Sequence, residues 1–164
     1  MDFQTKPEIC EYMVGLLHDT DLCVLEPTPG EGNLVKALKA AGHHVTAPKY
    51  FYDLPQSYYH AVVMNPPFTP MKEGYRILQA CLALAPIVIA LMPWLTVINS
   101  ERRSQMLYHY GIRSITHLPR SAFPGTRVQT CILHLHKDWC NPIMFHFYGQ
   151  EKWVHATEDS DGQF

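Results

Sequence analysis

The most constraining stretch of the chain is Ala61–Phe68, AVVMNPPF, in which an apolar run leads directly into Asn65, two prolines and an aromatic residue. A short, continuous apolar run predicts a strand buried on both faces of a mostly parallel sheet. Pro66 and Pro67 end that strand, because proline has no N–H to donate and its φ is fixed. An amide side chain is therefore expected at the carboxyl end of a central strand, where ligands bind in open α/β sheets.

The residue types in this stretch suit one kind of chemistry. The side-chain carbonyl of Asn65 and the backbone carbonyl of Pro66 can both accept hydrogen bonds. Two neighbouring acceptors match the two hydrogens of a planar amino group. When both hydrogens are hydrogen-bonded in this way, the lone pair of the nitrogen points toward an electrophile. The ring of Phe68 offers a face on which a flat substrate can stack. The alternative interpretation is a proline-rich turn that only closes a core strand.

Upstream of this stretch, the sequence predicts a strand, a glycine loop, a helix and a second strand. The expected strand is Leu22–Leu25, and Pro29-Gly30-Glu31-Gly32 forms a tight turn into a helix over Asn33–Ala41. Glycines let the backbone approach a ligand closely. The third glycine of a dinucleotide fingerprint is missing, which disfavours a nicotinamide cofactor. The second strand begins at His44–Ala47.

Together these motifs resemble those of the N6-adenine methyltransferases, which use S-adenosylmethionine (SAM). Asn65-Pro66-Pro67-Phe68 resembles their catalytic motif, and Glu26-Pro27-x-x-Gly30-x-Gly32 resembles their SAM-binding motif. The segment FQTKPEICEYMVGLL resembles the one that precedes the SAM-binding loop in one class of DNA methyltransferases. The order of these elements matches the gamma arrangement, and the resemblance covers roughly Phe3 to Lys137.

The resemblance implies a three-layer, Rossmann-like α/β fold in one domain over residues 1–164, with a terminal antiparallel hairpin. It also implies SAM as the cofactor and in-line methyl transfer to the exocyclic nitrogen of adenine in DNA, with the base flipped out of a duplex and stacked on Phe68. Glu26 would face the ammonium group of SAM. The catalytic residues that it implies are Asn65, Pro66, Pro67 and Phe68. The implied cofactor-binding residues are Thr5, Glu26, Pro27, Thr28, Gly30, Gly32, Asn33 and Asp53.

The middle of the chain departs from the family pattern. In the family, the second strand ends with an acid that binds the ribose hydroxyls, whereas this chain has Ala47-Pro48-Lys49. Pro48–His60 is too short for a helix, a strand and a helix, so a third strand is expected to be very short, near Tyr50–Leu54, or absent. Asp53 either contacts the adenine end of SAM or is a turn residue before Pro55. We expect weaker SAM binding than is usual in the family.

The remaining elements follow from local patterns. Thr5-Lys6-Pro7-Glu8 has the form of a capping box and predicts a helix to about His18. Helices are also expected over Met71–Leu84 and, capped by Asn99 or Ser100, to Tyr110. The expected strands are Ile87–Met92, Ser114–Leu118, Val128–His136 and a short edge strand, Met144–Tyr148. The core spans residues 3–148, and the polar, acidic end Glu158–Phe164 is expected to be loose.

The distribution of charge bears on the substrate. A formal net charge of −2 is unfavourable for a chain that holds nucleic acid unaided. Residues 71–137, however, contain eight basic and two acidic residues, a balance of +6. The residues predicted to contact phosphates are Lys72, Arg102, Arg103, Arg120 and Arg127. Alternatively these arginines belong to an ordinary solvated surface, Arg102 and Arg103 pair with Glu101 or cap carbonyls, and a separate recognition protein delivers the DNA.

Cysteine and hydropathy patterns set the remaining expectations. The five cysteines are odd in number and form no CxxC pair, which favours buried free thiols over disulfides. A zinc site at Cys131, His134, His136 and Cys140 is disfavoured, because alternation along a strand puts Cys131 on the opposite face, so no metal is predicted. The chain shows no apolar run of membrane length and no secretory signal, and we expect a cytoplasmic location.

Two other functions remain open. One keeps the chemistry but moves it to adenine in RNA or to the side-chain amide of glutamine in a protein. The other is a degenerate methyltransferase that serves as a binding or inhibitory module, for instance against host restriction. The missing ribose acid, the short middle of the chain and the expected lack of a DNA-reading domain after Lys137 favour it, whereas an intact Asn65 motif disfavours it. A lone, short catalytic domain resembles phage- or prophage-encoded members of the family.

Overall fold

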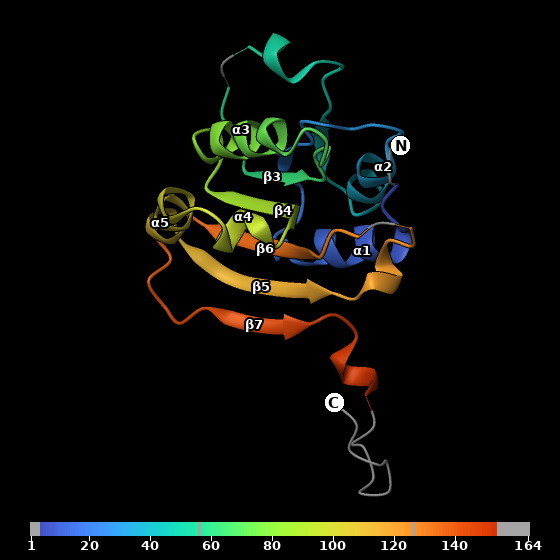
Figure 1. The fold of residues 1–164 in the computed structure, drawn as a ribbon. Helices are drawn as coiled ribbons and strands as arrows, with labels where there is room; N and C mark the ends of the chain where they lie inside the picture. Colours follow the sequence, from blue (N-terminus) through green and yellow to red (C-terminus); the bar gives the residue numbers. More distant parts are fainter. Residues whose placement is uncertain (1–3, 56, 126, 154–164) are drawn as a thin grey trace, which may run out of the picture.

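The computed structural model describes residues 4–55, 57–125 and 127–153 of the 164-residue chain. In this part of the chain, seven strands form one sheet with the order β2-β1-β3-β4-β6-β5-β7 (Figure 1). All neighbouring strands are parallel except the two pairs that involve β6. The strands are β1 (Cys23–Leu25), β2 (His44–Thr46), β3 (Ala61–Met64), β4 (Ile87–Pro93), β5 (Ile112–Leu118), β6 (Thr130–His136) and β7 (Met144–Phe147). The predicted fold class is confirmed.

The apolar stretch before Asn65 forms the central strand, as predicted. All four residues of β3 are buried, and β3 lies between β1 and β4, with Val62 paired to Leu25 on one side and to Val88 on the other. Parallel strands in this position are covered on both faces, which is why the sequence is continuously apolar there. The position of Asn65 is therefore fixed by the most buried strand of the sheet.

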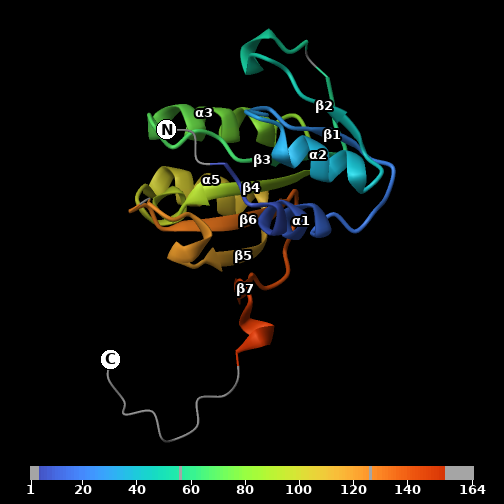
Figure 2. The same cartoon turned by 90° about the vertical axis from the view of Figure 1, so that its right-hand side faces the viewer.

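Helices cover both faces of the sheet and make three layers. In Figure 2, α3 and α5 lie on one side of the strands, and α1 and α2 lie on the other. Alternation along β3 divides its side chains between two cores, since Val63 belongs to the core under α1 and α2 and Val62 and Met64 belong to the core under α3 and α5. The helices are α1 (Pro7–Gly15), α2 (Asn33–Ala40), α3 (Met71–Leu82), α4 (Leu95–Ile98) and α5 (Glu101–Tyr110).

Six strands, all except β6, share one direction and end at the same edge of the sheet. The arrowheads of β3, β4, β5 and β7 point to the right in Figure 1, and the parallel pairing of β1 with β3 places its end there too. We call this side the carboxyl edge. The short helix η2 (Arg120–Ala122) lies at this edge, between the strands of the predicted antiparallel hairpin. The carboxyl edge thus gathers the loops that follow the central strands.

Strand β7 is the outermost strand and pairs with β5 in parallel, so the predicted edge strand is confirmed. The side-chain carbonyl of Gln150 accepts a hydrogen bond from the backbone N–H of Phe147 at 2.9 Å. Gln150 begins the short helix η3 (Gln150–Lys152), which turns back beside the end of the strand. One of the outward-facing backbone groups of this edge is therefore occupied from within the chain.

The segment between β2 and β3 is short, as predicted, and residues 47–55 and 57–60 contain no strand. Their one helical element is η1 (Phe51–Asp53), in a loop that projects away from the rest of the molecule (Figures 1 and 2). The hydroxyl of Tyr52 donates a hydrogen bond to a carboxylate oxygen of Glu73 at 2.6 Å, which ties the loop to α3. The absent-strand alternative is therefore the one that the structure adopts.

The N-terminal helix differs from its prediction at both ends. Its N-cap is Lys6, no side chain caps its first turn, and it ends at Gly15 rather than at about His18. The predicted capping box is wrong because the Thr5 hydroxyl is engaged elsewhere, as described below. The expectations for Phe3 and for Glu158–Phe164 fall outside the described residues. No helix in residues 4–55, 57–125 or 127–153 is long and apolar enough to cross a membrane.

Candidate functional site

Asn65 lies directly after β3, at the carboxyl edge, and its side chain is half-buried. The side-chain Nδ2 of Asn65 donates a hydrogen bond to the Oγ1 of Thr5 at 2.5 Å. Within the described part of the chain, no donor contacts the side-chain carbonyl of Asn65. The amide is therefore held through its nitrogen, and its oxygen remains available as an acceptor, which is what the predicted chemistry requires.

Thr5 joins the two predicted motifs. It is buried, and its backbone carbonyl accepts hydrogen bonds from the Nδ2 of Asn33 at 3.1 Å and from the Sγ of Cys10 at 3.7 Å. Its hydroxyl contacts Asn65. One residue of the N-terminal segment thus fixes both the start of α2, after the glycine loop, and the amide after β3. The structure brings Thr5, Asn33 and Asn65 together as the predicted site requires.

The proline turn is packed firmly against α3. Pro66 is buried, and Phe68 packs against the core under α1 and α2. Gly74 of α3 lies so close to the turn that a Cβ atom there would stand 3.1 Å from the carbonyl oxygen of Pro67 and 3.5 Å from the ring of Pro66. Close approach of a helix therefore fixes the backbone that carries the Asn65 motif. Sequence reasoning missed Gly74, although a glycine inside a predicted helix signals close packing.

The glycine loop between β1 and α2 has the backbone that only glycine adopts readily. Gly30 and Gly32 have φ angles of 52° and 88°, and nothing lies within 4 Å of a Cβ atom built on either residue. The N–H of Gly32 donates to the carbonyl of Pro29 at 2.7 Å, which closes the turn before α2. The glycines thus allow the positive φ angles of the turn, and they leave open space beside the loop. That space lies at the carboxyl edge, as predicted.

Glu26, at the end of β1, is a buried carboxyl group with few partners. It is 1% exposed, and its Oε1 accepts hydrogen bonds from the backbone N–H of Thr28 at 2.8 Å and from the Thr28 hydroxyl at 3.4 Å. Burial raises the pKa of Glu26 to about 8, and the Thr28 hydrogen bonds only partly oppose this. Pro27, between them, is also buried. A carboxyl group of this kind favours a cationic partner, which would stabilise its charged form.

Asp53 lies apart from these residues. It is exposed on η1, in the projecting loop after β2 (Figure 1), and no side-chain hydrogen bond or ion pair joins it to another described residue. Asp53 is the turn-associated residue before Pro55 that the alternative interpretation described. The structure does not bring it to the glycine loop.

The predicted phosphate-binding residues are spread over the molecule. Arg103 is engaged internally: its Nε and Nη2 donate to the carbonyls of Thr96 and Leu95, each at 2.8 Å, and its guanidinium lies 3.8 Å from the ring centre of Tyr75. This is the carbonyl-capping role that the alternative interpretation gave it. Arg102 is exposed in the first turn of the same helix.

The two arginine pairs do not share one surface. Helix α5, which carries Arg102 and Arg103, lies at the side opposite the carboxyl edge, whereas the segment with Arg120 lies at that edge (Figure 1). The side-chain oxygen of Gln129 accepts from the Nε and Nη2 of Arg120 at 2.6 and 3.0 Å, in the amide orientation that satisfies both groups. Arg127 is exposed, as is Lys72 at the start of α3.

The cysteine and histidine cluster of the sequence does not form a metal site. Cys131 and His134 are buried in β6, while Cys140 is exposed in the following segment. Burial is the main cause that lowers the pKa of His134 to about 4. Among the described residues, no group of three or more His, Cys, Asp or Glu side chains is placed to hold a metal ion.

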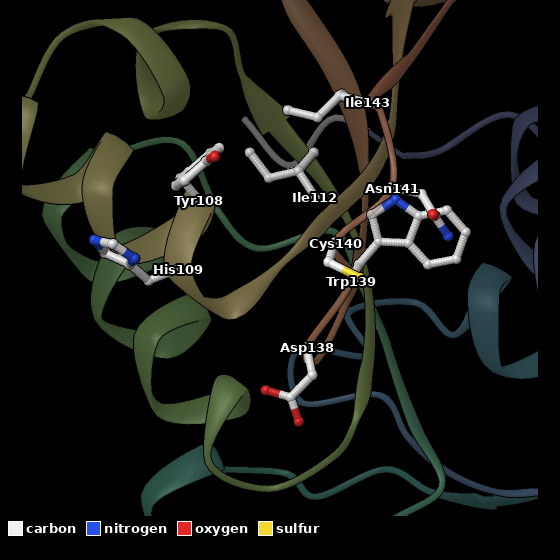
Figure 3. A pocket seen from close by; sticks show the side chains of 8 residues that line it. All are labelled: Tyr108, His109, Ile112, Asp138, Trp139, Cys140, Asn141 and Ile143. Carbon is white, nitrogen blue, oxygen red and sulfur yellow. The ribbon is translucent and has the colours of Figure 1, made fainter.

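One cavity lies away from all these residues. It has a volume of about 370 Å³ and opens between the end of α5 and the β6–β7 connection. In Figure 3, the lining residues Tyr108 and His109 lie on α5 on one side, and Asp138, Trp139 and Cys140 lie on the other side. None of the residues predicted for the site lines it, so this cavity belongs to a different part of the surface.

Comparison with known proteins defines the class of fold. No protein-family model and no curated protein sequence matches the chain. Among solved structures, a candidate class I SAM-dependent methyltransferase from Listeria monocytogenes superposes with a TM-score of 0.66 at 13% identity, over 86% of this chain and 63% of that one. The fold is therefore that of class I methyltransferases.

Two further solved structures with the same fold act in restriction-modification and on rRNA. A modification subunit of a type I restriction enzyme from Vibrio vulnificus YJ016 gives a TM-score of 0.72 at 12% identity, over 89% of this chain and 47% of that subunit. The 23S rRNA methyltransferase ErmE gives 0.61 at 15% identity, over 83% of this chain and 70% of that enzyme. The chain thus spans about half of the restriction subunit, and the shared property is the fold.

Proposed function

We propose that the protein transfers the methyl group of SAM to the exocyclic N6 nitrogen of adenine in DNA. The observation that carries the proposal is the Asn65 amide, which is fixed through its nitrogen by Thr5 and keeps its carbonyl available at the carboxyl edge. Asn65 Oδ1 and the Pro66 carbonyl accept the two amino hydrogens, and Phe68 supplies the ring against which the base stacks. The restriction-modification and methyltransferase structures that share the fold support this chemistry.

The residues at the glycine loop fit SAM. Gly30 and Gly32 leave open space at the carboxyl edge, and the buried Glu26 carboxyl suits the ammonium group of the methionine part. Pro27, Thr28 and Asn33 shape the same loop, and Thr5 covers it. When bound, SAM supplies an electrophilic methyl group. The end of β2 carries Ala47 in place of an acid, so we propose that SAM binds more weakly than is usual for this fold.

The residues proposed to act on the DNA backbone are Arg120 and Arg127, with Lys72 beside the proline turn. Arg120 lies at the carboxyl edge, and Arg127 and Lys72 are exposed. Few basic side chains gather there, so binding is mostly electrostatic, weak and sensitive to salt. We also propose that a partner supplies sequence recognition, as the resemblance to modification subunits of restriction enzymes favours.

A binding or inhibitory module is the second candidate function. The absence of an acid at the end of β2 favours it, as does the use of the Asn33 amide to hold Thr5. RNA is the alternative substrate, since an rRNA methyltransferase shares the fold.

Calorimetric titration with SAM, followed by tritium transfer from labelled SAM to matched DNA and RNA oligonucleotides, tests these proposals. SAM binding and label in DNA adenine are expected. Label in RNA alone would mean that RNA is the substrate. If the protein does not bind SAM, the binding or inhibitory module becomes the supported function.

A further inference from the structure

A second cavity lies at the carboxyl edge, at the ends of β5 and β7, which are the third and fourth strands from β3 in the sheet. It has a volume of about 470 Å³ and is lined by His117, Pro119, Ser121, Phe147, Tyr148 and Trp153. These residues come from the end of β5, from the segment around η2, and from the end of β7 with the turn that follows it. The cavity is therefore built from segments that the sheet brings together at the edge where Asn65 lies.

The walls of this cavity are flat rings. The ring centres of Phe147 and Trp153 are 5.5 Å apart, and those of His117 and Phe147 are 5.8 Å apart. Trp153 is 62% exposed and Phe147 43% exposed, so both rings present apolar faces to solvent. Exposed aromatic faces arranged in this way are typical of surfaces on which nucleic acid bases stack.

The aromatic surface continues toward the central strands. Phe147 lies 5.1 Å from Phe145, and Phe145 lies 5.9 Å from Trp94, measured between ring centres. Trp94 follows β4, the strand next to β3. A row of rings thus runs from the cavity along the outer strands to the end of the strand that neighbours Asn65.

The cavity also offers hydrogen-bonding groups to a base. The indole N–H of Trp94 can only donate, and it lies 2.9 Å from the Nδ1 of His117. Nδ1 of His117 is therefore the acceptor, and the proton of the neutral ring is on Nε2. Within the described residues Nε2 has no partner, so it is free to donate to a base oxygen or ring nitrogen. Ser121 also lines the cavity and is a second residue with a polar side chain.

The cavity and the Asn65 amide lie on two sides of one short segment. The Nζ of Lys6 donates to the carbonyl of Ser121 in the cavity wall at 2.8 Å, and the adjacent residue, Thr5, accepts from Asn65. Arg120 directly precedes Ser121, so two basic residues, Lys6 and Arg120, lie next to a residue of the cavity wall. The acidic residue Glu151 lies on the other side, two positions before Trp153 in the sequence, and the basic residue Lys152 separates them.

We propose that this cavity holds an unpaired base of a single-stranded nucleic acid whose target adenine occupies the site at Asn65. This deepens the proposed function and rests on it for the identity of the target base. A base in the cavity would stack on Trp153 and Phe147 and receive the hydrogen of His117 Nε2. An apolar side chain of a protein partner would leave the polar groups of His117 and Ser121 without partners, which disfavours it. A paired base in a duplex presents no free face to these rings, so single strands bind more tightly than duplexes.

Fluorescence anisotropy without cofactor tests the proposal, using a short single-stranded DNA and a duplex of the same sequence. The full chain is expected to bind the single strand more tightly than the duplex. Trp153→Ala should weaken single-strand binding about 5- to 150-fold, the range for one stacked base. Trp153→Phe keeps a ring and should stay within about threefold of the parent. Tyr58→Ala is the matched control, because Tyr58 is an 86% exposed aromatic residue in the projecting loop.

Phe147→Ala is the second variant, and thermal melting checks that each variant folds. The proposal is overturned if Trp153→Ala and Phe147→Ala both bind like the parent, or if duplex and single strand bind equally. It is also overturned if sedimentation shows a dimer that Trp153→Ala dissociates, because a second copy then occupies the cavity. Single-strand binding that depends on Trp153 in a chain that does not bind SAM would support the cavity and reject the methyltransferase proposal.

Discussion

Asn65 and Thr5 are 60 residues apart in the sequence, and their side chains meet at 2.5 Å through a hydrogen bond from Nδ2 to Oγ1. This contact sets the direction of the amide, because the oxygen of a planar amide group is fixed once its nitrogen is bound. It also makes the N-terminal segment part of the candidate site.

Thr5→Val should therefore disturb the site while keeping the shape of the side chain. Without the hydroxyl, the Asn65 amide loses its partner, and we expect methyl transfer to fall about 10- to 100-fold, as misplaced groups do. Thr5→Ser retains the hydroxyl and should stay close to the parent. Tritium transfer from labelled SAM gives the rates. A valine variant as active as the parent would show that Asn65 needs no such support.

Asn65→Ala should abolish methyl transfer and leave the affinity for SAM within about threefold of the parent, because in the proposed site the amide contacts the substrate amine rather than the cofactor. Asn99→Ala is the matched control, since Asn99 is an exposed asparagine at the end of α4. Transfer assays and calorimetry measure the two properties separately. If the alanine variant keeps its activity, another group binds the amine.

Glu26 should make the free energy of unfolding depend on pH. Its pKa is about 8 in the folded chain and 4.5 as the ordinary value. Between pH 4.5 and about pH 8, the Glu26 carboxyl is ionised in the unfolded chain and protonated in the folded chain. The contribution of Glu26 to the free energy of unfolding is therefore greatest below pH 4.5 and falls as the pH rises to about 8. The limiting slope is about 1.4 kcal/mol per pH unit.

Glu26→Gln keeps an acceptor for Thr28 and cannot ionise, so the difference in unfolding free energy between parent and variant isolates this group. Urea unfolding from pH 5 to 9 measures it. The buried His134, which titrates below its ordinary pKa, is present in both proteins and cancels. A difference that does not change with pH would mean that the Glu26 carboxyl is ionised in the folded chain.

Gly74→Ala should destabilise the protein and reduce transfer, because the new Cβ atom would lie 3.1 Å from the Pro67 carbonyl and α3 would have to move away. We expect a loss of about 1–3 kcal/mol, typical of overpacking. Gly15→Ala, at the end of α1, meets nothing within 4 Å and should be neutral or slightly stabilising. Equal effects of the two substitutions on the melting temperature would contradict this account.

Adjacent arginines on α5 should behave differently. Arg103→Ala removes two hydrogen bonds to carbonyls and a contact with Tyr75, and we expect it to cost about 2 kcal/mol of stability. Arg102→Ala removes an exposed side chain and should change stability by less than about 0.5 kcal/mol. Urea unfolding compares them. Equal stabilities would mean that the Arg103 contacts contribute nothing net.

The central strands of the sheet could be predicted from the sequence because each of them is a local apolar run. AVVM before Asn65 and IVIALM before Pro93 both read as buried strands, and both are. The N-terminal capping box was predicted wrongly for the opposite reason. The local pattern predicts that the Thr5 hydroxyl caps the helix. In the folded chain it instead accepts a hydrogen bond from Asn65, which is too distant in the sequence for a local pattern to include.

The basic residues show the same limit. Sequence spacing cannot tell an arginine that faces solvent from one that reaches back to carbonyls, and Arg103 reaches Leu95 and Thr96 only because α4 and α5 fold against each other. The base-sized cavity also could not be predicted from the sequence, because His117 and Trp153 line it together only as a result of the parallel pairing of β5 with β7.

The hydrogen bond from the Phe147 N–H to Gln150 has a consequence for behaviour in concentrated solution. A sheet that ends in an aromatic strand is a template for the next chain and invites fibrous aggregation. Gln150 occupies one of the outward donors of β7, and the turn that carries it stands beside the end of the strand. The aromatic rings of β7 are therefore exposed on a strand of which one outward backbone donor is no longer available to pair with a second chain.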